Sequence, residues 1–427
     1  MWHISFMIII IINASPWYTF AFQYSIPSIS LKFKNTPTTI NHLYEGKRKW
    51  LGGAITSDQS IIYGIPAHAH SIIRIKVQKE NYQIDSIALP IQYQKRRFKW
   101  LRGLITDNDL FGIPSWSSAG VLHMNIHNYD INVLPLPNLL KYNRWLWHGA
   151  SMIATETNIR IYCIPANANY VLKISNSNQR METSYIGPDL SHQNNKWYGG
   201  ILGYDQAVYG IPYAANSILR IDTNNDTVSL LGDFGHGQYN WHGGILSPIN
   251  GAIYAFPSHA ETILKINTQN QTFTQLPIDA PTQILKQKYK WLGGTIGMDN
   301  CIYGMPSDCT SILRIDPNTD ICTIFGSTAL SKMKGKNKWQ GGVLANDGCI
   351  YAIPSDANCV LQIDTHSNID DGERIAFIDT SIDSVSDKWQ GGFLASDGNI
   401  YAIPENADRI LRVVIGDKKQ NSYLELL

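Results

Sequence analysis

Residues 338–354 read Lys-Trp-Gln-Gly-Gly-Val-Leu-Ala-Asn-Asp-Gly-Cys-Ile-Tyr-Ala-Ile-Pro, and a phrase of this form occurs eight times along the 427-residue chain. Its tryptophan recurs every 44 to 50 residues, at Trp50, Trp100, Trp147, Trp197, Trp241, Trp291, Trp339 and Trp389. An aromatic residue precedes a proline by three positions in every copy, at Tyr63, Phe111, Tyr162, Tyr209, Tyr254, Tyr303, Tyr351 and Tyr401. A repeat of this length indicates an array of similar supersecondary units.

Each copy divides into four short strands. The first begins at the glycine pair, and Asp347-Gly348 supplies the positive φ that a tight hairpin requires. The second runs from Ile350 to Ile353 and ends at Pro354, because proline cannot donate to a continuing ladder. A third apolar segment, 360–363, and a looser fourth segment, 374–378, complete the unit.

The second and third strands are apolar on both faces, so each sheet needs cover on two sides. Sheets packed around an axis provide that cover and leave only short edges. We therefore predict an all-β fold: a closed eight-bladed β-propeller with four antiparallel strands per blade. The last blade keeps its own fourth strand at 422–426, so closure needs no strand from the start of the chain.

The N-terminus differs from the repeats. Residues 4–12 are an apolar run followed by small residues, which is typical of a secretory leader. We assign residues 1–24 to a signal peptide or an uncleaved membrane anchor, and 25–427 to one propeller domain. Residues 28–33 are expected to add a strand at the outer edge. Two glycosylation sequons, at Asn225 and Asn270, fall at turns and agree with export.

The blade signature, Asp-Gly-x-Ile-Tyr followed by Ile-Leu-Arg-Ile-Asp, is read with changes at Asp299 to Asp316, where asparagine replaces the glycine, and at Asp347 to Asp364, where the second part is Val-Leu-Gln-Ile-Asp. It resembles the blades of NHL-type and streptogramin-lyase-like propellers, and its glycine doublet ahead of a tyrosine is partly Kelch-like. The Kelch tryptophan should follow the tyrosine, whereas here it precedes the glycines. The resemblance covers the chain from Lys49 onward and implies an architecture, since a fold alone does not fix an activity.

Composition excludes several function classes. The 35 basic and 34 acidic residues leave no global field for nucleic acid, and a membrane would be reached only through an uncleaved N-terminal segment. Six cysteines include no C-x-x-C pair, which gives zinc or redox chemistry little support. They are expected to be small buried side chains. No cofactor and no metal site is predicted.

Lysine precedes six of the eight tryptophans, and this pattern has two interpretations. The pairs could line the channel mouth and hold an anion such as an acidic glycan. Alternatively, the tryptophans wedge between blades while the lysines extend along the surface or pair with loop carboxylates. Because residues repeated in every blade usually maintain the blade, we favour a structural role.

Positions that vary within the repeat are better candidates for ligand binding. The residue after the tryptophan is leucine in three blades, but three neighbouring blades carry His148, Tyr198 and His242. We predict that these form a polar arc on one side of the ring, suited to hydrogen bonding. A shared metal is disfavoured because the two histidines are separated by a whole blade, and ordinary packing remains the alternative.

Loops after each proline are expected on the same rim as the tryptophans. Their variable residues include His68, His70, Trp116 and His259. The first and last blades adjoin, so His68 or His70 could approach Glu405 for acid–base work, although a solvated loop pair is the simpler expectation. Arg102 replaces the first glycine of blade two and should project into the channel.

The sequence predicts a secreted or surface-attached binding scaffold for a protein or glycan ligand. The candidate ligand-binding residues are His68, His70, Arg102, Trp116, His148, Tyr198, His242 and His259. The alternative is a hydrolase or lyase working through a histidine on the rim. No nucleophile elbow or phosphate loop is present in the sequence, so whether the chain is an enzyme is left open.

Overall fold

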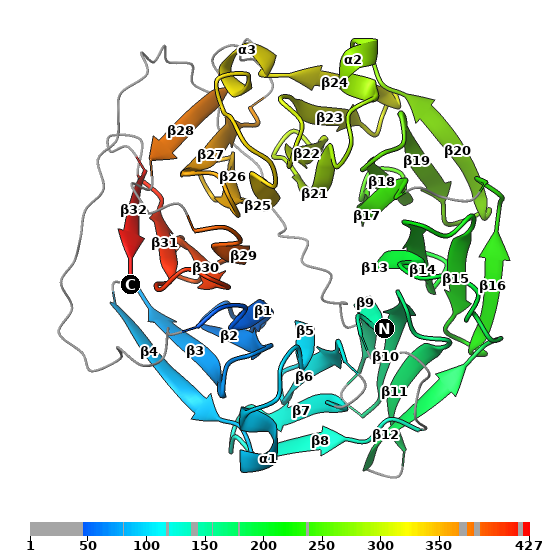
Figure 1. Cartoon of the computed structure of the whole chain (residues 1–427), viewed down its shortest axis with the longest axis vertical. Coiled ribbons are helices and arrows are strands. Elements are labelled where there is room, and N and C mark those ends of the chain that lie inside the picture. Colours follow the sequence, from blue (N-terminus) through cyan, green and yellow to red (C-terminus); the bar gives the residue numbers. More distant parts are fainter. Residues whose placement is uncertain are drawn as a thin grey trace, which may run out of the picture.

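A computed structural model describes residues 46–427 except 80, 117–118, 138–143, 156, 178–179, 236–238, 367–373, 380–384 and 417–421. The expected leader and the extra strand at 28–33 lie outside the described residues. The described residues form eight four-stranded antiparallel sheets, arranged as blades in a ring (Figure 1). The predicted eight-bladed propeller is confirmed.

Strand bounds repeat from blade to blade. The innermost strands are β1 (Trp50–Ile55), β5 (Trp100–Ile105), β9 (Trp147–Ala154), β13 (Trp197–Leu202), β17 (Trp241–Leu246), β21 (Trp291–Ile296), β25 (Trp339–Leu344) and β29 (Trp389–Leu394). The second strands are β2 (Ile61–Pro66), β6 (Asp109–Pro114), β10 (Ile159–Pro165), β14 (Ala207–Pro212), β18 (Ala252–Pro257), β22 (Ile302–Pro306), β26 (Cys349–Pro354) and β30 (Ile400–Pro404).

The third strands are β3 (Ser71–Gln78), β7 (Val121–Asn125), β11 (Val171–Ser177), β15 (Ile218–Asp222), β19 (Thr262–Asn267), β23 (Ile312–Asp316), β27 (Cys359–Asp364) and β31 (Leu411–Val414). The outermost strands are β4 (Asn81–Ala88), β8 (Ile131–Leu134), β12 (Arg180–Ile186), β16 (Thr227–Leu231), β20 (Thr272–Pro277), β24 (Ile321–Phe325), β28 (Ile375–Asp379) and β32 (Tyr423–Leu426). One-turn helices α1 (Ile91–Gln94), α2 (Thr282–Leu285) and α3 (Ser327–Leu330) lie in the connections between blades. In the described ranges, no helix is both long and apolar enough to cross a membrane.

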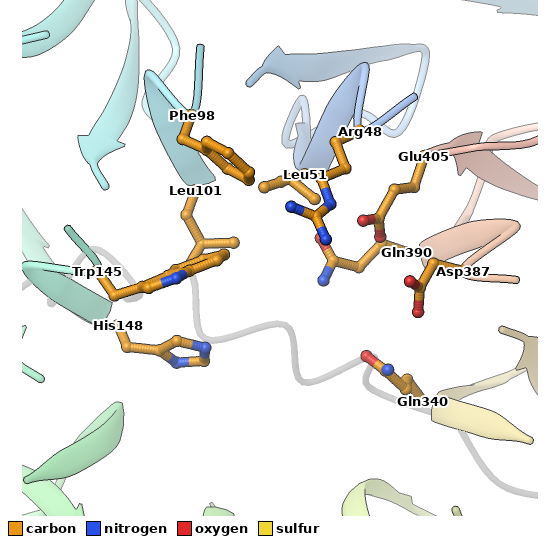
Figure 2. Close-up of a pocket in the computed structure, with 10 residues that line it drawn as sticks. All are labelled: Arg48, Leu51, Phe98, Leu101, Trp145, His148, Gln340, Asp387, Gln390 and Glu405. Atoms are coloured by element: carbon orange, nitrogen blue, oxygen red, sulfur yellow. The ribbon is translucent and has the colours of Figure 1, made fainter. Parts of the chain in front are cut away.

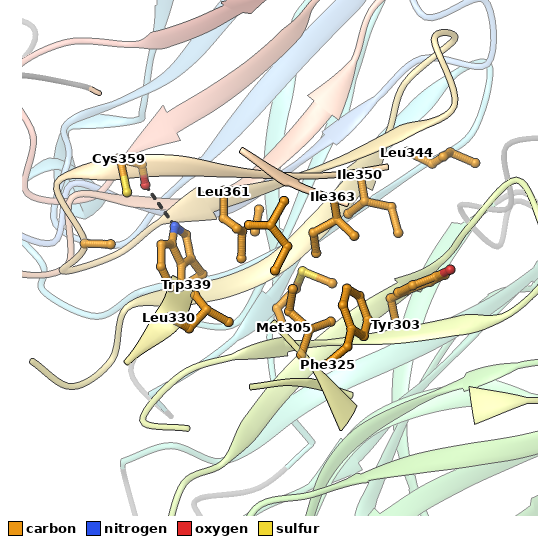
Figure 3. Packing of buried hydrophobic residues seen from close by; sticks show 14 of the residues in the cluster. Tyr303, Met305, Phe325, Leu330, Trp339, Leu344, Ile350, Cys359, Leu361 and Ile363 are labelled. Carbon is orange, nitrogen blue, oxygen red and sulfur yellow. Dashed lines mark hydrogen bonds between the residues drawn. The ribbon is translucent and has the colours of Figure 1, made fainter. Parts of the chain in front are cut away.

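The apolar core lies between blades rather than within them. Met305 and Phe325 of one blade pack against Trp339, Ile350 and Leu361 of the next (Figure 3). The indole Nε1 of Trp339 donates to the carbonyl of Cys359, 2.8 Å away in its own blade. All eight repeat tryptophans make the same bond, to a carbonyl at the start of the third strand or one or two residues before it. Each tryptophan therefore braces its own blade while filling a junction.

The repeated lysines also stabilise the junctions. Lys99 is fully buried, and its Nζ donates to the carbonyls of Ala67, Ala69 and Arg96 at 2.8–3.0 Å. Lys196 makes the equivalent three bonds to the preceding blade. An ammonium has three donors, so both are saturated by protein carbonyls. These lysines are not available to an anion, which agrees with the structural role favoured above.

Glycine occupies the two positions of the repeat's glycine pair for different physical reasons. The first adopts positive φ in every blade, at a bulge where β25, for example, shifts register between Trp339 and Gly342. The second is crowded, since a Cβ at Gly294 would lie 2.1 Å from the Tyr303 carbonyl oxygen. Arg102 occupies the first glycine slot with φ of +65°, a conformation unfavourable for a residue with a side chain.

Candidate functional site

One rim of the ring carries the variable residues, as the sequence predicted. Each innermost strand begins at its tryptophan opposite the proline that ends the second strand, as in Trp339 opposite Pro354. The connections before each tryptophan and after each proline therefore meet at one end of the central channel. We call this end the mouth.

The residue two positions before each tryptophan is held in the left-handed region of φ, between +47° and +64°. Glycine stands at none of these eight sites, which are Arg48, Phe98, Trp145, Asn195, Tyr239, Tyr289, Asn337 and Asp387. The conformation is fixed by hydrogen bonds such as those from the Asp308 amide to the Tyr289 carbonyl and from the Asn406 amide to the Asp387 carbonyl, both 3.0 Å. Positive φ is uncommon for bulky residues, so the fold maintains it at a cost of stability.

Aromatic side chains occupy the mouth over blades two to six. We define this aromatic arc by Phe98, Trp116, Trp145, His148, Tyr198, Tyr213, Tyr239, His242, His259 and Tyr289. Four of its rings form a continuous stack, His148 on Tyr198 (3.9 Å between centroids), Tyr198 on Tyr213 (4.2 Å) and Tyr213 on Tyr239 (4.6 Å). His242 meets the Tyr198 ring edge-on at 5.1 Å. The stack offers an extended flat surface.

The opposite side of the mouth, over blades six to eight, is polar. This polar arc comprises Asp308, Asn337, Gln340, Asp356, Asp387, Gln390 and Glu405. Asn337 Nδ2 donates to Asp387 Oδ1 at 2.8 Å, and Gln340 Nε2 donates to Asn337 Oδ1 at 2.6 Å. The Asp308 and Asp356 carboxylates each accept a backbone N–H of the next blade at 2.7 Å. Those two aspartates therefore stabilise junctions, while Asp387, Gln390 and Glu405 face the channel.

The two arcs meet around one cavity of about 230 Å³. Its walls are Arg48, Leu51, Phe98, Leu101, Trp145, His148, Gln340, Asp387, Gln390 and Glu405. Figure 2 shows the apolar side chains on one side of this space and the amides and carboxylates on the other, with Arg48 between them. The cavity is thus amphipathic, joining blades one, two and three to blades seven and eight.

Burial sets the protonation of the groups at the mouth. It lowers the pKa of His242 to about 4 and that of His148 well below its usual value, and the charge of Arg102 adds to both shifts. Both imidazoles are therefore neutral at physiological pH. Burial, reinforced by the charge of Asp387, raises the pKa of Glu405 to about 8, although Arg48 and Lys49 oppose the shift. Glu405 is 8% exposed and stands in a slot that holds alanine or serine in six other blades.

The structure brings most of the sequence candidates to the mouth in three groups. His148, Tyr198 and His242 lie together, with 5.9 Å between the two imidazole centroids. His68 and Trp116 both contact Phe98, at 4.3 Å and 4.9 Å between centroids. His259 meets the edge of Tyr289 at 4.5 Å. Arg102 is exposed and lies outside the cavity walls, and its charge acts on both histidines.

In the described part of the chain, neither His68 nor His70 forms a hydrogen bond or ion pair with Glu405. His68 packs against Phe98, and burial with the charge of Lys99 lowers the His68 pKa to about 4. His70 is exposed and lies outside the cavity walls. The charges that act on Glu405 are those of Asp387, Arg48, Lys49 and Asp356. Within the described residues, no group of three or more metal-ligating side chains is placed to hold an ion.

Sequence reasoning missed the eight residues that precede the tryptophans by two positions. Arg48, Phe98, Trp145 and Asp387 line the cavity, yet none was a candidate. The signal was available, because the eight copies place six different residue types at this position, whereas the residue that follows is lysine in six copies and the next is always tryptophan. Variation within a repeat, used above for the residue after the tryptophan, also identifies this slot.

Comparison with known proteins supports the fold. The chain is similar to the crystal structure of virginiamycin B lyase from Staphylococcus aureus, with a TM-score of 0.51 and 16% identity over 85% of this chain and 94% of that one. A streptogramin B lyase structure matches with a TM-score of 0.50 and 15% identity, covering 72% of this chain and 91% of that one. No family model and no curated protein matches the sequence. At these identities the likeness concerns the fold alone, and it agrees with the resemblance read from the blade signature.

Proposed function

We propose that this chain is a secreted or surface-attached binding propeller that engages a protein or glycan ligand at the mouth. The observation that carries the proposal is the cavity where the aromatic and polar arcs meet. Its walls come from five blades, and its charged and aromatic members occupy slots that vary in the repeat. Scaffold stability does not require this set of side chains, because other blades fill the same slots with leucine, asparagine or serine.

The sequons support export and leave the mouth free. Asn225 and Asn270 are exposed in the turns between the third and fourth strands of their blades. Third strands begin at the mouth, so these turns lie at the opposite end of the ring. A glycan attached at either asparagine would not cover the cavity.

The repeat itself supplies substitutions for a binding test. His68→Asn, Trp116→Asn, Tyr198→Leu and His242→Leu each introduce a residue that another blade carries in the same slot. The combined variant should fold, and we expect it to lose at least ten-fold in affinity for ligands selected by the wild-type chain. The probes are a printed glycan array and a phage-displayed peptide library, followed by titration calorimetry.

The matched control is Tyr204→Ser, at an exposed tyrosine in the turn after β13, which lies away from the mouth. Circular dichroism and thermal melting verify the fold of both variants. Ligands that bind the combined variant and the wild type equally would refute the assignment of these four mouth residues to the binding site.

A further inference from the structure

The cavity walls match a ring that is apolar on its face and polar around its edge. Leu51, Phe98, Leu101 and Trp145 form a continuous apolar wall. Gln340, Asp387, Gln390 and Glu405 face it from the other side (Figure 2). Indole and phenyl groups pack on C–H surfaces, while amides and carboxyls bind hydroxyl groups. A pyranose has both features in one small ring, since its C–H groups form an apolar face and its hydroxyl groups lie around the edge.

Two wall groups have unmet hydrogen-bonding capacity. Gln390 Oε1 and His148 Nδ1 are buried atoms without a hydrogen-bond partner in the described part of the chain. Buried polar atoms of native proteins are nearly always paired, so an unpaired one indicates a missing partner. Gln390 Oε1 can only accept, which requires a donor from the occupant. A hydroxyl group can donate to Gln390 and can either donate to or accept from the neutral His148.

Charge favours an uncharged occupant. The lysines next to the tryptophans are engaged with backbone carbonyls, so they cannot attract an anion. In the walls, the guanidinium of Arg48 is offset by the carboxylate of Asp387, and Glu405 keeps its proton at neutral pH. Among these wall residues, a net charge on the ligand would meet no uncompensated opposite charge, and its desolvation would cost free energy. The charge of Arg102, which acts on His148, comes from outside the cavity walls.

Size limits the occupant to one ring. The volume of about 230 Å³ is below the roughly 300–1,000 Å³ of pockets that hold drug-sized ligands. An aromatic side chain of a peptide would also fit, but it carries at most one hydroxyl group. Six wall residues present polar atoms, namely Arg48, His148, Gln340, Asp387, Gln390 and Glu405. An occupant with several hydroxyl groups satisfies more of them.

From these observations we infer that the cavity is a subsite for one uncharged pyranose, the terminal sugar of a glycan. The sugar ring lies against Trp145 and Leu101, and its hydroxyl groups bind Gln390, Gln340 and His148. This inference rests on the proposed function, because it names the ligand class of the same mouth. It does not require that the rest of the glycan contact the protein.

The test is saturation-transfer NMR of the full chain with separate methyl glycosides of glucose, galactose, mannose, fucose and N-acetylglucosamine. Methyl glucuronide and methyl glucosaminide serve as charged comparators. We expect at least one uncharged glycoside to bind, and to bind at least ten-fold more tightly than its charged comparator where one exists. Gln390→Leu and Trp145→Asn should each weaken that binding ten-fold or more.

Both variants use residues that the repeat places in these slots, leucine at 51, 101 and 292 and asparagine at 195 and 337. Tyr204→Asn is the matched control, because it also replaces an aromatic residue by asparagine, at an exposed position at the end of the ring opposite the mouth. Its affinity for the glycoside should equal that of the wild type. Binding by no uncharged glycoside, or equal binding by wild type and Gln390→Leu, overturns the sugar subsite.

The two proposals fail separately. If no glycoside binds but the combined mouth variant still loses array or peptide ligands, the sugar subsite is wrong and the binding function stands. If the combined variant keeps all its ligands but Gln390→Leu loses the glycoside, the binding site is confined to the cavity, since none of the four combined positions lines it. If neither variant loses a ligand, both proposals fail.

Discussion

Several residues at the mouth adopt a positive φ, which is unfavourable for residues with a side chain. A bulky residue at positive φ costs of order 1–2 kcal/mol, and Phe98, Trp145 and Tyr289 all adopt it. In some blades the strained residue's N–H is bonded by an asparagine or aspartate two residues after the proline of the preceding blade. Asn167 accepts the Asn195 N–H in this way at 2.7 Å. At other junctions a ring contact replaces this bond, as between His259 and Tyr289. The same backbone geometry thus holds either a polar or an aromatic residue two positions before the tryptophan.

Glu405 should give the protein a distinctive pH dependence. Its pKa rises from 4.5 to about 8 on folding, so the folded state retains a proton that the unfolded state loses between these values. This contribution to stability is complete below pH 4.5 and is lost as pH rises toward 8. We compare the free energy of unfolding of Glu405→Gln with that of the wild type at each pH. Between pH 4.5 and pH 8.5 this difference should shift in favour of the variant by roughly 2–4 kcal/mol.

Urea unfolding of both proteins at pH 4.5, 6.5 and 8.5 measures that difference. The subtraction removes other titrating groups, including His148 and His242, which the two proteins share. A free-energy difference that stays constant over this range would show that Glu405 is ionised normally in the folded protein.

At the scale of strands, the blade signature encodes a polar clasp. In blade four, Asp205 in the turn after β13 accepts from Tyr209 of β14 at 2.9 Å and pairs with Arg220 of β15 at 2.9 Å. Blade six repeats this with Asp299, Tyr303 and Arg314. The aspartate of the turn between the first and second strands and the arginine of Leu-Arg-Ile-Asp are therefore structural partners. Their recurrence reflects the scaffold and carries no catalytic meaning.

Blades three and five lack the turn aspartate and use their neighbours instead. Tyr162 donates to Asp226 of the following blade at 2.7 Å, and Lys173 pairs with the same carboxylate at 2.6 Å. Tyr254 and Lys265 do the same with Asp320. Lysine replaces arginine in both blades, because the partner now lies across the junction. In blades four and six these contacts join strands of one blade, whereas in blades three and five they join two neighbouring blades.

We expect Asp226→Asn to destabilise the ring by about 1 kcal/mol, since the pair is partly exposed and its tyrosine retains other acceptors. The measurement is a double-mutant cycle with Lys173→Met in urea unfolding. A coupling energy of roughly 0.5–1 kcal/mol is expected. The exposed Glu182→Gln serves as the control and should be neutral, while additivity of Asp226→Asn and Lys173→Met would contradict the cross-blade pair.

The strands were predictable because each has a local cause. Pro354 ends a ladder, Gly348 makes a turn, and Ile350 to Ile353 need cover on both faces. The mouth was predictable only in part. The position of His148 and Tyr198 varies between blades while the tryptophan before it is constant, so the sequence identified it. The role of Trp145 depends on a positive φ, which its residue type does not predict. The raised pKa of Glu405 depends on burial and on Asp387, which the chain brings near only through the fold.

Over the whole molecule, each junction of two blades holds its own hydrophobic cluster. The junction between blades eight and one is built like the others, with Ile403 and Tyr401 packed against Trp50, Ile62 and Ile73. Hydrogen bonds cross it too, from the Lys49 amide to the Glu405 carbonyl at 3.0 Å. The fourth strand of blade eight comes from the C-terminus, as predicted, and pairs with β31. Among the described residues, blades eight and one are therefore joined by lateral packing, with no strand exchanged between them.

Closure can be tested by comparing equivalent side chains around the ring. Ile403 and Ile353 both precede the proline of their blade, are at most 1% exposed, and pack across the next junction. If the ring is closed in solution, Ile403→Ala and Ile353→Ala should each cost about 2–5 kcal/mol and agree within roughly 1 kcal/mol in urea unfolding. If the ring opens between blades eight and one, Ile403 already contacts water, and Ile403→Ala should cost far less than Ile353→Ala. The exposed Ile321→Ala controls for a change of residue type without loss of packing. Because the cavity draws its walls from both sides of this junction, an open ring would also divide the proposed site.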